Sequence, residues 1–209
     1  SSAASDVYKR QPLDNVCMDI DYMEDFKDFT WNPVHFPDLK ATNARMKDEH
    51  IHLVPIIDAG IKQLTGDPIY DEGVQKDYFV KKADGSLFVG AVWPGRACFP
   101  DFLREDVRQW FGAKYHKLMD TGIEGFWNDM NEPVVFPDRT FPMDTRHEYD
   151  GMPCSHEKAH NIYGQCMAEA SWLGMKRHAP DRRPFLLSRS GFAGLQRFAA
   201  TWTGDNRSS

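Results

Sequence analysis

The sequence predicts an α/β fold in which parallel strands alternate with helices, as in part of a (β/α)8 TIM barrel. Short apolar runs alternate regularly with amphipathic segments along the chain. The apolar runs are nearly continuous, which is typical of strands that are covered on both faces. Polar side chains follow the ends of these runs, and barrel active sites are built at those ends. No glycine-rich dinucleotide or phosphate loop is present, so a barrel is favoured over a doubly wound sheet.

Five apolar segments are predicted to form the strands. Pro55 lies inside the second of them and counts against a central strand, but the flanking pattern is otherwise strong. The predicted strands cover residues 15–22, 51–57, 123–128, 184–188 and 199–203.

The helices expected between these strands follow from apolar residues at helical spacing. In the third helical segment, Val107, Trp110 and Phe111 recur on one face, and Gly122 follows the end. Asp38 stands at the start of the first. The predicted helices cover 37–49, 104–120 and 157–177, with a polar connection over 62–82, a hairpin over 83–90 and a Pro- and Asp-rich loop over 134–155.

Composition narrows the function classes. The 209 residues suit one domain or part of a larger one, and the net charge of −6 is spread without blocks. This balance argues against nucleic acid or an anionic membrane as the main partner, and no apolar run approaches the ~18–20 residues of a membrane span. The four cysteines are widely spaced and are interpreted as reduced thiols, which favours a cytoplasmic location.

The segment GFWNDMNEP, residues 125–133, carries the strongest chemical signal. It places Asp129 at a strand end beside Trp127. An indole can stack on the apolar face of a pyranose while a carboxylate attacks its anomeric carbon. The alternative is a buried Asp that caps a loop. A second carboxylate, Asp205, follows in ATWTGDN.

The octet GFWNDMNE matches the active-site signature of glycoside hydrolase family 31, the retaining α-glucosidase family. The chain resembles this family from about residue 14 to 206, and MDIDYM, PIIDAG, VWPG, LLSRSGFAG and TWTGDN follow the family's order. The resemblance implies that Asp129 is the nucleophile and Asp205 the acid/base. Asp129 should then stay ionised near a cation, while less polar surroundings or a neighbouring charge should keep Asp205 protonated.

The resemblance also implies a glucose pocket. Arg189 and Asp19 would bind sugar hydroxyls, Asp19 those remote from the anomeric carbon. The pocket walls would be Ile20, Ile56, Trp93, Trp127, Met130 and Trp202.

Four further polar residues near these motifs are interpreted as structural. Strand alternation would point Asp21 away from Asp19. Asp58 is expected to support a strand end, and Asn131 and Glu132 to shape the loop.

The resemblance sets the expected domain organisation and partners. Residues 1–12 do not resemble the family and are expected to be a disordered lead-in, whereas 13–209 would be a partial barrel with approximately strands two to six. The expected partners are a small α-glucoside or oligosaccharide, the missing barrel strands and flanking β-domains of a parent protein, and further copies in a homo-oligomer. No nucleic acid, membrane, cofactor or metal is expected.

The implied activity is that of a retaining, exo-acting α-glucosidase. An α-xylosidase is the alternative within the family, although Asp19 favours a sugar with a C6 hydroxymethyl group. A non-catalytic carbohydrate-binding barrel would not need two carboxylates. The segment HEKAH, residues 156–160, fits the zinc motif H-E-x-x-H, but Glu169 follows His160 by only nine residues and no third ligand is spaced correctly.

Overall fold

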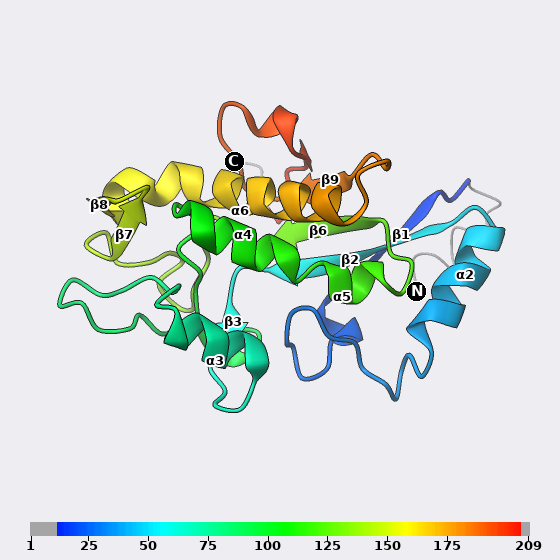
Figure 1. The fold of residues 1–209 in the computed structure, drawn as a ribbon, viewed down its shortest axis with the longest axis horizontal. Helices are drawn as coiled ribbons and strands as arrows, with labels where there is room; N and C mark the ends of the chain where they lie inside the picture. The colour runs from blue at the N-terminus through cyan, green and yellow to red at the C-terminus, as the bar shows by residue number, and fades with distance from the viewer. Residues whose placement is uncertain (1–11, 206–209) are drawn as a thin grey trace.

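The computed structural model describes residues 12–205, which are built around one parallel sheet (Figure 1). Five strands lie in the order β1-β2-β6-β9-β10, and every neighbouring pair is parallel. They are β1 (Asn15–Met18), β2 (His52–Asp58), β6 (Gly125–Asp129), β9 (Phe185–Ser188) and β10 (Ala200–Thr201). The strands of this sheet follow one another in space in the same order as in the sequence, and helical segments connect them. This arrangement is that of part of a (β/α)8 barrel, as the sequence predicted.

The first strand is shorter than predicted. β1 ends at Met18, and the 3-10 helix η1 (Ile20–Tyr22) replaces the second half of the expected strand 15–22. The reason is local, because the Asp19 carboxylate accepts a hydrogen bond from Ile20 N at 2.7 Å and caps this turn. The argument from strand alternation for Asp21 therefore fails, and Asp21 lies exposed on the 3-10 turn.

The predicted helices form, with one interruption. They are α2 (Leu39–Asp48), α4 (Glu105–Ala113), α5 (His116–Met119) and α6 (His156–His178). Asp38 caps α2 by accepting a hydrogen bond from Ala41 N. The expected helix 104–120 is broken between α4 and α5, where Tyr115 N donates to Gly112 O in a tighter turn.

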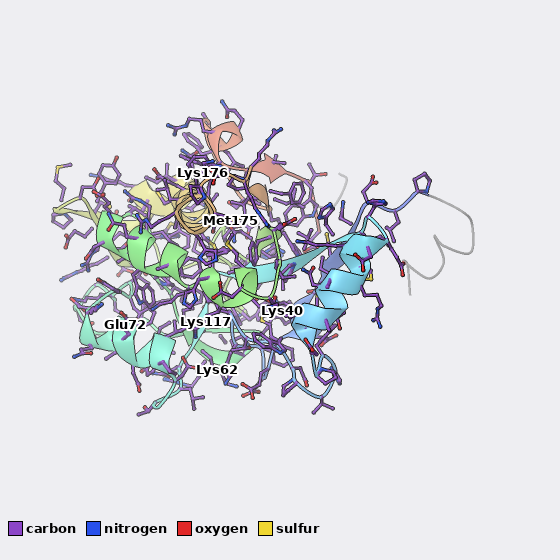
Figure 2. All side chains as sticks on the ribbon, turned by 45° about the vertical axis from the view of Figure 1, so that its right-hand side comes forward. Lys40, Lys62, Glu72, Lys117, Met175 and Lys176 are labelled. Atoms are coloured by element: carbon purple, nitrogen blue, oxygen red, sulfur yellow. The ribbon has the colours of Figure 1, made fainter. Side chains whose placement is uncertain are left out.

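Some elements were missed in the stretches predicted to be connections. α3 (Pro68–Gln75) lies within the expected polar connection, and Asp67 caps it by accepting hydrogen bonds from two backbone N–H groups. Glu72 of α3, labelled in Figure 2, contacts Lys114 after α4 and so joins α3 to the main helix layer. The further strands are β3 (Ile61–Lys62), β4 (Gly90–Val92), β5 (Gly95–Cys98), β7 (Arg146–Tyr149) and β8 (Met152–Ser155), and the second short helix is η2 (Leu195–Arg197).

These short strands form two antiparallel units. β3, β5 and β4 make a three-stranded sheet, and β7 pairs with β8 inside the expected loop 134–155. The hairpin expected over 83–90 forms as a short one, in which Lys82 N donates to Ser86 O at 2.8 Å and Lys81 pairs with Leu87 in an antiparallel bridge. A second hairpin, of β4 and β5, follows it.

The long helices pack closely on one face of the main sheet (Figure 1). Gly112 of α4 and Gly174 of α6 meet backbone to backbone, and a Cβ atom at Gly174 would lie 2.1 Å from Gly112 O. Beneath them, Tyr115 and Phe126 pack edge to face in the core. No helix in the described range 12–205 is long and apolar enough to cross a membrane.

Alternation along the strands separates the core from the candidate site. Asn128 of β6 is fully buried and meets the helix layer, where its amide donates to Tyr115 Oη and accepts from Ser171 Oγ, both at 2.9 Å. The next residue, Asp129, must face the opposite side of the sheet. The strand therefore directs one polar side chain into the core and its neighbour towards the barrel interior.

Candidate active site

Three adjacent strands end at the same level and bring charged residues together. Asp58 of β2 and Asp129 of β6 are partners in the parallel register. Arg189 directly follows β9, and its N–H donates to Asn128 O at 3.1 Å. Because partners in a parallel ladder face the same side, Asp58 and Asp129 project from one face of the sheet.

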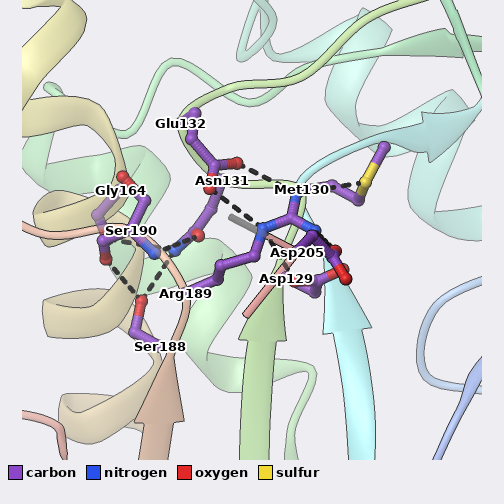
Figure 3. Close-up of polar contacts among 9 residues, drawn as sticks. All are labelled: Asp129, Met130, Asn131, Glu132, Gly164, Ser188, Arg189, Ser190 and Asp205. Carbon is purple, nitrogen blue, oxygen red and sulfur yellow. Dashed lines mark hydrogen bonds and ion pairs between the residues drawn. The ribbon is translucent and has the colours of Figure 1, made fainter. Parts of the chain in front are cut away.

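Arg189 is the centre of the polar contacts (Figure 3). Its Nη1 donates to Asp129 Oδ2 at 3.1 Å and to Asp205 Oδ2 at 2.8 Å. Its Nε and Nη2 donate to the two carboxylate oxygens of Glu132 at 2.9 and 3.1 Å, and Nη2 also lies 3.3 Å from Met130 Sδ. One guanidinium thus joins three carboxylates, two from the end of β6 and the turn after it and one from the segment after β10.

A sharp turn after β6 places Glu132 against Arg189. Met130 adopts a left-handed backbone with φ 55°, which redirects the chain immediately after Asp129. Asn131 is fully buried; its side-chain Nδ2 donates to Ser188 Oγ at 2.9 Å, while its side-chain Oδ1 accepts from Ser190 N at 3.1 Å. The turn is therefore fixed to the end of β9.

The burial of Asp129 shapes its acidity. Burial raises the pKa of Asp129 to about 6, and the charge of Arg189 opposes this rise. Oδ1 lies 3.1 Å from Arg189 Nε but makes no hydrogen bond within the described chain. Oδ2 therefore accepts a hydrogen bond from Arg189, whereas Oδ1 is in ion-pair contact with Nε without accepting one.

A buried acid pair lies beside this carboxylate. Asp28 Oδ1 accepts a hydrogen bond from Asp58 N at 2.8 Å. Burial raises the pKa of Asp58 to about 8, with a further rise from the charge of Asp129 and an opposing effect of Arg189. Burial also raises the pKa of Asp28 well above its usual range. Sequence reasoning left Asp58 as a strand-end support and did not single out Asp28.

The residues predicted to bind sugar fall into two groups. Trp127 and Trp202 pack edge to face with ring centroids 5.6 Å apart, and Trp127 Nε1 donates to Met18 O at 3.3 Å. Ile56 is the register partner of Trp127. Asp19 and Ile20 follow Met18 at the end of β1, so both lie at this end of the sheet.

Trp93 lies at the tip of the β4–β5 hairpin, where it is 45% exposed and contacts Phe136 at a centroid distance of 5.2 Å. This contact brings together aromatic rings from the hairpin and from the loop after β6. Sequence reasoning did not single out Phe136, because nothing in the local pattern shows that the loop returns to the hairpin.

The surroundings expected for Asp205 differ from those observed. Its side chain is 83% exposed although it forms an ion pair with Arg189. Less polar surroundings therefore do not keep the Asp205 carboxyl group protonated in this chain. It lies beyond the edge strand β10, with no cover from the described residues.

The HEKAH segment forms a hydrogen-bonded chain of histidines. His156 Nδ1 lies 3.0 Å from His147 Nε2, and His156 Nε2 lies 3.2 Å from His160 Nδ1. His147 Nδ1 in turn contacts Asp101 at 2.9 Å. Both ring nitrogens of His156 are therefore occupied, which opposes the zinc interpretation of the motif. Within residues 12–205 no cluster of three or more His, Cys, Asp or Glu is placed to hold a metal.

The arrangement defines the class of protein. Two carboxylates share one guanidinium nitrogen, so their oxygens can be no farther apart than those two contact distances together. This upper limit lies below the ~6.5–9.5 Å that separates the two carboxyl groups of inverting glycoside hydrolases. With indoles beside the carboxylates on a barrel-type sheet, the fold and site are those of a glycoside hydrolase.

The chain belongs to glycosyl hydrolase family 31, whose TIM-barrel domain matches residues 5–209. It is 47% identical to α-glucosidase 2 of Bacillus thermoamyloliquefaciens over 97% of this chain and 26% of that protein. The solved family 31 α-glucosidase from Bacteroides thetaiotaomicron is 41% identical, with a TM-score of 0.81, over 98% of this chain and 33% of that one. The glucosidase II α subunit gives a TM-score of 0.88 at 36% identity, over 99% and 23% of the two chains.

The chain spans about a quarter of the length of the curated relatives that it matches, with 26% and 30% of two α-glucosidases covered. Their activities and assemblies therefore belong to larger proteins. The glucosidase II catalytic subunit, for example, has been solved in a heterodimeric complex with the binding domain of a regulatory subunit.

Proposed function

We propose that this chain carries the catalytic carboxylates of a retaining, exo-acting α-glucosidase that releases glucose from small α-glucosides. The observation that carries the proposal is the contact of Asp129 and Asp205 with the same Arg189 nitrogen. The relatives whose printed names are α-glucosidase support the substrate class.

The first half of the reaction needs a nucleophile and an acid. Asp129 Oδ1, which accepts no hydrogen bond from residues 12–205, attacks the anomeric carbon and forms a glycosyl ester. The bond from that carbon to the glycosidic oxygen breaks, and Asp205 donates a proton to the leaving oxygen. Arg189 neutralises part of the negative charge that the two carboxylates would otherwise impose on each other.

The second half reverses the role of Asp205. Once Asp129 is esterified it has lost its charge, so Arg189 favours the ionised form of Asp205. Asp205 then removes a proton from water, the water oxygen attacks the anomeric carbon, and the ester bond to Asp129 breaks. Glucose leaves with the configuration of the substrate, and both carboxyl groups return to their first state.

The pocket walls favour glucose over xylose. Asp19 lies at the end of β1, and the indoles of Trp127 and Trp202 provide apolar ring surfaces for a pyranose. Ile20, Ile56, Met130 and Trp93 are proposed as the remaining walls. A xyloside lacks the hydroxymethyl group that a remote carboxylate could bind.

Release of p-nitrophenol from the α-glucoside and the α-xyloside tests the proposal on the full-length gene product. We expect glucoside turnover, lost by several orders of magnitude in Asp129→Ala and unchanged in Asp120→Ala, whose exposed carboxylate lies beyond the opposite end of β6. Proton NMR of the first sugar formed should show retained α configuration. Binding of glucosides by a folded protein without turnover would instead support a carbohydrate-binding barrel, and faster xyloside cleavage would support an α-xylosidase.

A further inference from the structure

We propose that Glu132 is a positioning residue that occupies the fork of Arg189 and thereby keeps one oxygen of Asp129 free to attack the sugar. This inference rests on the proposed function. It goes beyond the sequence interpretation of Glu132 as a residue that only shapes the loop.

The contact between Glu132 and Arg189 is bidentate (Figure 3). Nε donates to Oε1 at 2.9 Å and Nη2 donates to Oε2 at 3.1 Å. Two parallel N–H···O bonds fix the plane of a guanidinium as well as its distance. Nη1 then supplies the hydrogen bonds that Arg189 donates to Asp129 and Asp205.

The contacts of Asp129 show what this fork prevents. Asp129 Oδ1 lies 3.1 Å from Arg189 Nε, yet Nε donates its hydrogen bond to Glu132. Without Glu132, a small rotation of the guanidinium would allow it to form its own two-bond fork with Asp129. Both carboxylate oxygens would then be engaged, the pKa of Asp129 would fall, and the carboxylate would become a poorer nucleophile.

Burial makes this competition strong. The Arg189 side chain is only 11% exposed, so water can replace a lost carboxylate partner poorly. A guanidinium in this setting is expected to turn to the buried carboxylate that it already contacts, which is Asp129, because both Asp129 oxygens lie 3.1 Å from Arg189 nitrogens. The Glu132 contact therefore differs from an exposed ion pair that could be lost without consequence.

The same turn also holds the residues on both sides of Arg189. The buried side chain of Asn131 contacts Ser188 before Arg189 and Ser190 after it, at 2.9 and 3.1 Å. Consecutive residues of the turn thus fix the two neighbours of Arg189, through Asn131, and its side chain, through Glu132. Because Asn131 holds the loop in place, Glu132 can act on the guanidinium without determining the conformation of the loop.

A double-mutant cycle tests the proposal on the full-length gene product. We expect Glu132→Ala to lower kcat at least tenfold and to move the acid limb of the kcat/KM profile to lower pH. Glu132→Gln should retain more activity, because its amide oxygen can still accept from Nε. In an Arg189→Lys background, which keeps the charge but has no fork, Glu132→Ala should change kcat less than about twofold.

Glu124→Ala is the matched control. Like Glu132, Glu124 contacts an arginine, Arg182, and it contacts Lys47 in addition. Its side chain is 31% exposed against 35% for Glu132, but it lies at the opposite end of β6. It should behave as the wild type in every measurement.

The outcomes separate this inference from the proposed function. An active wild type with equal losses in both backgrounds, or with Glu132→Gln as impaired as Glu132→Ala, would overturn the role of the fork. A folded wild type that shows no turnover would instead overturn the proposed function. If Glu132→Ala does not fold by circular dichroism, Glu132→Gln in the two backgrounds decides the question.

Discussion

Acid should destabilise the fold through His156, and substitution of this residue should remove that effect. His156 is fully buried, with both ring nitrogens in hydrogen-bond contact. Burial lowers the pKa of His156 to about 3, with smaller contributions from His147 and His160. The folded state therefore keeps this imidazole neutral at a pH where the unfolded chain protonates it.

The sign and size follow from proton linkage. A base whose pKa falls on folding contributes its full stability above the unfolded value of about 6.5, and loses it progressively as the pH falls towards 3. Between pH 7 and pH 5 the unfolded state gains about three quarters of a proton at this position, and the folded state gains almost none. The free energy of unfolding should therefore fall by ~2 kcal/mol over this range from His156 alone.

Urea unfolding of the 209-residue chain at pH 7 and pH 5 measures this difference. His156→Gln loses some stability at both pH values because of altered packing, so the comparison is between pH dependences. We expect the variant to lose ~2 kcal/mol less than the wild type between the two pH values. His35→Gln is the control, since that exposed side chain meets water in both states. Equal pH dependence in the wild type and His156→Gln would refute the reasoning.

Two further predictions concern the helix contact and the acid pair. Gly174→Ala places a Cβ 2.1 Å from Gly112 O, so α4 and α6 must separate; the free energy of unfolding should fall by ~1–3 kcal/mol, and an unchanged urea midpoint would contradict the close contact. Burial raises the pKa of Asp58 to about 8, so the folded state keeps a proton that the unfolded chain releases, and stability falls as the pH rises from about 4 to 8. Asp58→Asn cannot ionise, and melting temperatures at pH 5 and pH 8 should differ less in this variant than in the wild type.

Much of the main sheet could be predicted because its signals are local. Four of the five strands, β1, β2, β6 and β9, contain an apolar run. Asp129 and Arg189 end or follow such runs, so their positions can be read from the sequence. β7 and β8 escaped prediction because both are largely exposed and have no apolar run. α3 was missed because its sequence lies in a polar stretch, where the cap at Asp67 is the main helical signal.

The candidate site was harder to predict where it depends on contacts between distant segments. Glu132 and Arg189 are separated by 57 positions, and only the register of β6 and β9 brings them together. The exposure of Asp205 and the burial of Asp58 likewise depend on which elements cover each strand end. Residue type and spacing alone carry no information about that cover.

The position of Asn128 has a consequence for laboratory evolution. Its side chain is bonded to Tyr115 and Ser171 in the helix layer, and the next residue in the chain is Asp129. A substitution at Tyr115 or Ser171 changes what holds Asn128 and so shifts the strand that carries the carboxylate. Variants selected for altered turnover should therefore arise in this buried layer as well as in the loops, and screens confined to residues near the sugar would miss them.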